Sequence, residues 1–386
     1  MNPGNRLVKR RHGSRRRRRS LLRRVVPPTI ALLLSAFAVA LYLFLFTPVP
    51  DPPAPVIAGG EMEAPVERTR MLAPVRLPAD DGPHATATEW WYYSGHLFGE
   101  QGEHFSFHAT VFLRDAMVRH TVFHGSLTDH TRGDRYKDQF RTGGVPSPGN
   151  AAGFDFRHRG WQISGFGPNH TVTMQGEGYA LELELVDAYP PVLHRAAGSA
   201  TPGLLDFGDA GITYYYSRPR MQARGTVSTR GQPPIEVTGE IWFDHQWGDF
   251  EPTHTGWNWF ALQLDDGSNL MVYELFDRQG GPLLLAGSRS FGGALRPLSA
   301  ADVQVRPLGI WRSPDTGVSY PASWEIELPE GTLFVEPLLL DSEFDGRETI
   351  FKLYWEGAVR VSGVQEGIGF VELSGYESIL SGWRFE

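Results

Sequence analysis

Apolar and polar residues alternate along much of the chain with the two-residue period of a β-strand. Between residues 104 and 113 the odd-numbered positions are all apolar and the even-numbered ones are mostly polar, which predicts one buried face. The aromatic stretch 90–98 precedes it, and the two are separated by Gly99 to Gly102, a hairpin turn. The same signals predict further strands at 160–166, 171–175, 179–185, 211–217, 221–229 and 235–242.

Stretches with a helical period are scarce. Only residues 113–120 and 299–305 allow a short helix, while 44 glycines and 29 prolines supply many turns. Short strands separated by Gly/Pro turns predict an all-β fold of the barrel or sandwich type.

A weak internal repeat divides the body of the chain. Each copy is an aromatic strand that runs into a glycine-containing turn and then a second strand. Two unrelated aromatic strands are the alternative reading; otherwise the body holds two related β domains that meet near residues 251–255. The positions that recur, each displaced by 167 residues, are Trp90, Tyr92, Tyr93 and Leu97, matched by Trp257, Trp259, Phe260 and Leu264.

The N-terminus has the pattern of a membrane signal anchor. Residues 1–24 hold eleven Lys or Arg and no acid, and residues 25–50 carry no charge. About twenty apolar residues span a bilayer, and the positive flank favours a cytoplasmic N-terminus. We therefore expect a basic cytoplasmic tail (1–24), one transmembrane helix (25–47) and a body outside the cytoplasm, in the periplasm. A signal peptide cleaved near Ala38-Val39-Ala40 is the alternative.

The rest of the chain is acidic and contains no cysteine. Residues 48–84 are rich in proline and are expected to form an extended linker. Beyond residue 24 there are 25 basic and 44 acidic residues, so nucleic acid is not an expected partner. The lack of cysteine excludes disulfides, thiolate metal sites and a lipid anchor on cysteine. No G-x-S-x-G elbow, phosphate loop, dinucleotide fingerprint or H-E-x-x-H motif occurs.

Histidines are the first candidates for chemistry. His104 and His108 share one strand face, and His120 and His124 have the same spacing. A metal site there is conceivable, but no carboxylate or cysteine completes the set. We therefore predict neither a metal nor a cofactor.

The segment 240–260 is the richest in chemistry, since it sets Asp244 and His245 among four tryptophans. On a strand, His245 and Trp247 share one face and Asp244 points to the other. These residues either line a ligand cavity or form a buried tie at the seam between the domains. Glu89, which opens the aromatic strand, has the same ambiguity, because burial could make it a proton donor.

At these residues the chain resembles the AttH-like and carotenoid hydratase (hydroxyneurosporene synthase) family of lipocalin-like proteins. The resemblance covers roughly residues 85–386 and implies two lipocalin-like β-barrel domains, 85–252 and 253–386, each with room for an apolar ligand. The motifs that carry it are Glu89-Trp90-Trp91-Tyr92, Trp242 to Gly248, Gly256 to Gln263, Tyr354 to Val359 and Gly369 to Tyr376.

The hydratase branch implies cofactor-free addition of water to a double bond of an acyclic carotenoid. His245 and Trp247 match the family's His-x-Trp pair, and Tyr273 matches a tyrosine one strand later. The hydratases place an aspartate two residues beyond that tyrosine, where this chain has Leu275. The candidate catalytic residues are His245, Trp247, Tyr273, Asp244 and Glu274, and the candidate ligand-binding residues are Glu89, Trp91, Tyr93, Trp257 and Trp259.

Three functions remain open from the sequence. The first is a membrane-anchored protein that binds a hydrophobic lipid or isoprenoid-like ligand, with a transporter permease as a possible partner. The second is a hydratase-like lyase, and the third is a structural component of an envelope complex in which the tryptophans form the domain seam.

Overall fold

The computed structural model describes residues 73–114, 119–144, 153–195, 200–206, 211–250, 255–277 and 280–378. Helix in these ranges is limited to two short 3-10 turns, η1 (Ala79–Asp81) and η4 (Tyr376–Ser378), so the all-β prediction is confirmed. The expected transmembrane segment 25–47 lies outside the described residues. Among those described, no helix has the length and apolar character needed to cross a membrane.

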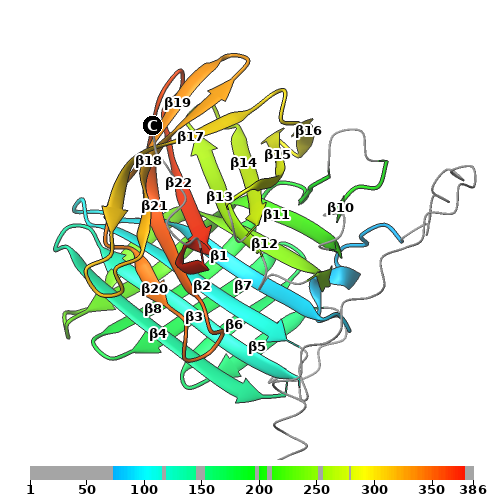
Figure 1. Ribbon diagram of the computed structural model, residues 1–386. Helices are drawn as coiled ribbons and strands as arrows, with labels where there is room; N and C mark the ends of the chain where they lie inside the picture. The colour runs from blue at the N-terminus through cyan, green and yellow to red at the C-terminus, as the bar shows by residue number, and fades with distance from the viewer. Residues whose placement is uncertain are drawn as a thin grey trace, which may run out of the picture. The chain divides into compact units, whose positions relative to one another are not determined.

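The first half of the described chain forms one antiparallel sheet, drawn in blue through cyan to green in Figure 1. Its strand order is β4-β3-β2-β1-β12-β11-β8-β7-β6-β5, with the short β9 and β10 also paired to β11. The strands are β1 (Thr88–Gly99), β2 (His104–Arg114), β3 (His120–Asp129), β4 (Asp134–Gly143), β5 (Phe154–His158), β6 (Trp161–Phe166), β7 (Asn169–Gly176), β8 (Tyr179–Asp187), β9 (Val192–Leu193), β10 (Leu204–Asp206), β11 (Gly211–Thr229) and β12 (Ile235–Phe250).

The second half forms a second antiparallel sheet, yellow-green through yellow to red in Figure 1. Its order is β16-β15-β14-β13-β22-β21-β19-β18-β17, with β20 paired to β21. The strands are β13 (Thr255–Leu264), β14 (Asn269–Asp277), β15 (Pro282–Phe291), β16 (Ala294–Leu298), β17 (Gln304–Arg312), β18 (Ser319–Leu328), β19 (Gly331–Pro337), β20 (Glu343–Asp345), β21 (Leu353–Gly363) and β22 (Gly367–Ser374).

The two sheets begin in the same way. In the first, β1 lies between β2 and β12, its second and last strands. In the second, β13 lies between β14 and β22. Both sheets curl into lipocalin-like half-barrels, whereas closed barrels were expected: among the described residues no pairing joins β4 to β5 or β16 to β17.

Some strand limits differ from the prediction for a local reason. Residues 211–217 and 221–229 form one strand, β11, whose register shifts between Arg218 and Met221. Pro219 lies in this irregularity, where its missing N–H costs no ladder hydrogen bond. The possible helix at 299–305 is a turn followed by β17. The possible helix at 113–120 begins as the end of β2, and residues 115–118 lie outside the described ranges.

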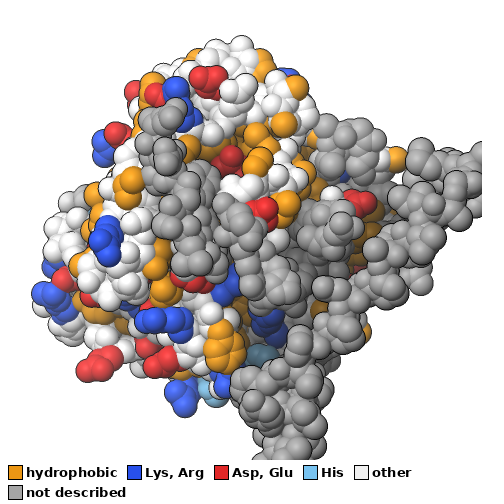
Figure 2. All heavy atoms as spheres, viewed as in Figure 1, with side chains coloured by type: hydrophobic (Ala, Val, Ile, Leu, Met, Phe, Trp, Pro, Cys, Tyr) orange, Lys and Arg blue, Asp and Glu red, His pale blue; other side chains and the backbone are white. Residues whose placement is uncertain are grey.

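Both faces of the central strands are buried. Odd-numbered residues of β1, such as Trp91 and Tyr93, face the core inside the first half-barrel. Even-numbered ones, such as Tyr92, face a cluster shared with Trp259 and Phe370 of the second sheet. A further core fills the second half-barrel around Trp324 and Trp355. The two sheets belong to one compact unit, Met71–Glu386. On the face shown in Figure 2, acidic and basic side chains are interspersed with apolar ones.

Candidate functional site

A row of side chains crosses the first sheet on the face toward the second. Tyr92 of β1 is in register with Asp244 of β12 on one side and Thr110 of β2 on the other. The row continues to Ser217 of β11 and to His124 of β3. Cross-strand neighbours lie on the same face of a sheet, so these five residues form one line across five strands.

A second row crosses the other sheet. Trp259 of β13 is in register with Tyr273 of β14 and with Glu372 of β22. Glu372 is in turn in register with Glu356 of β21. Two carboxyl groups therefore lie side by side, next to an indole and a phenol.

The two rows meet at the seam. The rings of Tyr92 and Trp259 contact edge to face, with centroids 5.2 Å apart. Trp259 Nε1 donates a hydrogen bond to the Tyr215 hydroxyl at 3.0 Å, and the Tyr92 hydroxyl donates to Glu356 Oε1. These contacts fix the second sheet against β1, β11 and β12.

A cleft opens between the rows. It encloses about 1120 Å³ of empty space, including the part open to solvent. Half of the twenty residues that line it are aromatic or aliphatic, and the other half are polar or charged. The apolar ones are Trp90, Tyr92, Phe112, Tyr215, Trp257, Trp259, Tyr273, Leu275, Ile350 and Tyr354, and the polar ones are Thr88, Thr110, Arg114, Asp244, Gln246, Thr255, Lys352, Glu356, Glu372 and Ser374.

Asp244 is the best-satisfied carboxylate of the cleft. It accepts hydrogen bonds from the Tyr215 hydroxyl at 2.6 Å, from Trp242 Nε1 at 2.7 Å and from the Ser217 hydroxyl. Burial raises its pKa to about 7, although these three donors act in the opposite direction. Because Tyr215 also accepts from Trp259, Asp244 ties the two sheets together. This is the geometry of the buried tie that the sequence left open.

Glu356 and Glu372 have fewer partners. Burial, followed by the charge of Glu372, raises the pKa of Glu356 well above its ordinary value. Burial raises the pKa of Glu372 to about 7. Glu372 accepts one hydrogen bond, from Trp257 Nε1 at 3.2 Å. A carboxyl with a pKa near neutrality can act as a general acid and then as a base, and the neighbouring aromatic faces can stabilise a cation.

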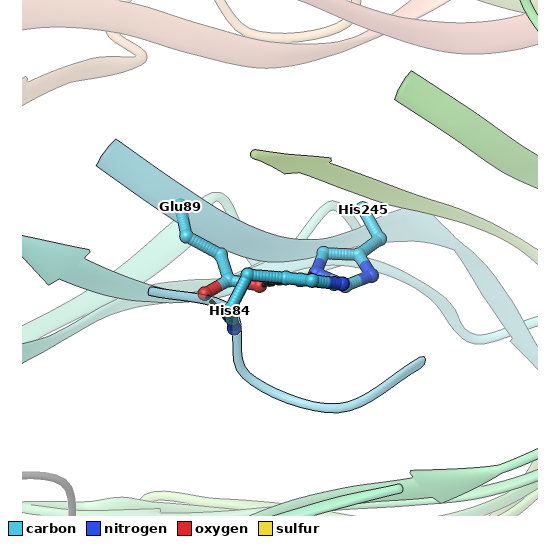
Figure 3. Close-up of side chains that lie close together, drawn as sticks. All are labelled: His84, Glu89 and His245. Carbon is cyan, nitrogen blue, oxygen red and sulfur yellow. Dashed lines mark hydrogen bonds and ion pairs between the residues drawn. The ribbon is translucent and has the colours of Figure 1, made fainter. Parts of the chain in front are cut away.

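A second polar cluster lies on the opposite face of β1 and β12, inside the first half-barrel (Figure 3). Glu89 Oε1 is 2.7 Å from His84 Nδ1 and 2.9 Å from His245 Nε2. Burial alone would raise the pKa of Glu89, but the hydrogen bonds from the two imidazoles outweigh it and lower that pKa. Trp91 stacks on His245, and Trp247 stacks on His84.

The sequence-predicted residues are thus divided between the two faces. Asp244, Tyr273, Trp257 and Trp259 line the cleft. Five others, His245, Trp247, Glu89, Trp91 and Tyr93, belong to the interior of the first half-barrel or contact it. Glu274 is in neither group; its Oε2 accepts from Asn258 Nδ2 at 2.9 Å.

The histidines considered as metal ligands each have other partners. His104 stacks on His96 and lies near His130. His108 contacts Ser126 and Glu356. His124 contacts the Tyr354 hydroxyl at 2.8 Å, so it helps to join the sheets.

Residue-by-residue reasoning missed Glu356 and Glu372. Each stands in a strand that is otherwise largely buried, Leu353–Gly363 and Gly367–Ser374. A glutamate inside such an apolar strand is the signal that could have identified them, because an unpaired buried charge is costly.

Comparison with known proteins agrees with an all-β protein of two lipocalin-like sheets. The sequence model of the AttH-like family matches residues 67–376, and the chain therefore belongs to the AttH-like family. A crystal structure of a putative AttH protein from Nitrosomonas europaea is 27% identical, with a TM-score of 0.71, and the match covers 79% of this chain and all of that one.

Two matches carry the name of a hydratase. Kievitone hydratase of Fusarium solani subsp. phaseoli is 25% identical over 202 residues, which is 48% of this chain. The chain spans little more than half of that relative, 56% of its length. The crystal structure of kievitone hydratase from Nectria haematococca is 16% identical with a TM-score of 0.65, and the match covers 79% of this chain and 94% of that one; this likeness concerns the fold.

The tie across the seam predicts a stability effect. Tyr215→Phe removes the hydroxyl that joins Asp244 to Trp259, and leaves both without one partner. We expect a loss of about 1–3 kcal/mol in the free energy of unfolding, measured by denaturant titration. Tyr214→Phe is the control, because its hydroxyl bonds the exposed Ala73 carbonyl. Equal losses in both variants would contradict the tie.

The raised pKa of Glu372 predicts a pH effect on stability. The fold favours the protonated carboxyl, so this stabilisation is present at pH values below about 4.5 and is lost as the pH rises through about 7. We expect Glu372→Gln to flatten the fall in unfolding free energy over that window, by at most about 1.4 kcal/mol per pH unit. Glu366→Gln, in the exposed turn before β22, is the control. An unchanged slope in Glu372→Gln would contradict the assignment.

Proposed function

We propose that the protein binds an apolar, alkene-containing small molecule in the cleft between the sheets and adds water to its double bond without a cofactor. One observation carries this proposal: Glu356 and Glu372 lie side by side in an aromatic cleft, and both have raised pKa values. The match to a relative named as a hydratase supports the same reaction class.

Glu372 is the proposed proton donor. Unlike Asp244, which has three side-chain donors, it has one, and it is only partly buried. Its carboxyl proton forms a new C–H bond at one alkene carbon, and the cation develops at the other. The faces of Trp259 and Tyr273, its neighbours in the row, stabilise this cation.

Water completes the reaction. Its oxygen bonds the cationic carbon, and its proton passes to the carboxylate left on Glu372, which regenerates the acid. The overall reaction consumes one alkene and one water and forms one alcohol, and it needs no oxidant or reductant. Glu356 lies beside Glu372 and is held by the Tyr92 hydroxyl. Besides burial, the charge of Asp244 raises the pKa of Glu372.

Binding without turnover is the second candidate. The aromatic and aliphatic lining of the cleft favours it, because such pockets bury most of an apolar ligand. In that case the carboxyls serve only to fix a polar group of the ligand.

Turnover separates these candidates. The purified protein is incubated with acyclic isoprenoid alkenes in isotopically labelled water, and products are analysed by mass spectrometry. We expect a product that has gained one labelled water. In Glu372→Gln its rate falls by roughly 10²-fold or more, while quenching of tryptophan fluorescence by the alkene persists. Glu366→Gln is the control for both readouts. Quenching with no product from any alkene would leave binding alone, and no quenching would reject both candidates.

We further propose that residues 25–47 anchor this body to the outer face of the cytoplasmic membrane. The basic tail and the adjoining apolar run support this placement. We expect the full chain to stay with membranes after alkaline extraction. The double substitution Leu33→Arg and Phe37→Arg should release the chain from the membrane, because each arginine costs about 2.5–3.5 kcal/mol in the bilayer. Complete extraction of the unaltered chain would contradict the anchor.

A further inference from the structure

The strongest feature that the proposed reaction does not use is the cluster in Figure 3. Three side chains from distant segments converge there: His84 from the loop after η1, Glu89 from the start of β1 and His245 from β12. One donor atom from each lies within 4.8 Å of the others. We propose that His84, Glu89 and His245 bind a divalent transition-metal ion, with zinc as the best match.

The donor set fits this chemistry. Two imidazoles and one carboxylate are a known zinc set that leaves a fourth position open. Tetrahedral bonds of about 2.0–2.2 Å place neighbouring donors roughly 3.3 Å apart. The two contacts of Glu89 Oε1, at 2.7 and 2.9 Å, therefore need to open by only about half an ångström.

The surroundings hold these donors in place before a metal arrives. Trp247 lies parallel to the His84 ring, with centroids 4.2 Å apart, and Trp91 stacks on His245 at 4.4 Å. The second oxygen of Glu89 is held by the His84 backbone N–H at 2.8 Å, and Arg119 lies 3.6 Å from it. Such outer contacts orient metal ligands, and here they leave Oε1 directed at the two imidazoles.

The exposure of the three side chains indicates how an ion would reach the site. Glu89 and His245 are fully buried, whereas the His84 side chain is 22% exposed, so an ion enters from the His84 side.

This site is independent of the proposed reaction. His245 faces the first half-barrel, while Asp244, the next residue before it, faces the cleft. A metal here joins the segment before β1 to the sheet. Loss of the metal is therefore expected to leave the cleft carboxyls in place.

The test is metal uptake by the full-length protein after removal of metals with a chelator. We expect Co²⁺ to bind once per chain with the visible absorption of a four-coordinate N/O site, to be displaced by Zn²⁺, and Zn²⁺ to raise the unfolding temperature. His84→Ala removes the most exposed ligand and should weaken Co²⁺ binding at least tenfold. Circular dichroism checks that this variant keeps its fold.

Two further variants sharpen the result. Glu89→Gln keeps the side-chain shape and should also lose Co²⁺ affinity, whereas His158→Ala, a histidine on β5 away from the cluster, should bind as the unaltered protein does. Failure of the unaltered protein to take up either ion, or equal binding by His84→Ala, would overturn the proposal. The hydrogen bonds of Glu89 with the two histidines would then serve only to hold the loop after η1 against the sheet. Neither outcome changes the alkene assay.

Discussion

The structure depends on one constraint: β1 and residues 241–248 of β12 are buried on both faces. An ordinary antiparallel sheet has one face on a core and the other in water, whereas here each face has its own core. A buried carboxylate on these strands therefore needs hydrogen-bond donors inside the protein. The hydrogen bonds from Asp244 through Tyr215 to Trp259 meet this demand on one face, and those of Glu89 with two histidines meet it on the other.

The same residue type behaves in opposite ways on the two faces. Glu89 is buried, but two imidazoles donate to it, and its pKa is lowered. Glu372 is surrounded by aromatic rings and a second carboxyl, and its pKa is raised to about 7. Burial acts on both in the same direction, so the difference lies in the number of donors. The ionised carboxylate of Glu89 suits the binding of a cation. The protonated carboxyl of Glu372 suits the transfer of a proton.

Much of this could be predicted from the sequence. Alternation predicted strands between residues 90 and 242, and the repeat added the two strands after residue 256. The repeat also indicated that Trp257 and Trp259 occupy the positions of Trp90 and Tyr92. Neither signal predicted β4, β5 or the strands after β14. Alternation also predicts that Asp244 and His245 lie on opposite faces of the strand. It does not predict that both faces are buried, or which distant strand packs on each face. Glu356 approaches Tyr92 only because β21 of one sheet meets β1 of the other, and no local pattern encodes that contact.

The repeat has a further consequence at the seam. Tyr92 and Trp259 are equivalent positions of the two halves, and they touch each other. Their neighbours in register, Asp244 and Glu372, are equivalent as well. The seam thus has the form of an isologous contact, in which a surface meets its own copy, but within one chain the copies are free to diverge. One carboxyl has three donors and serves as an anchor, while the other has one donor and is available to a ligand. A symmetric pair of separate subunits would have to give both carboxyls the same role.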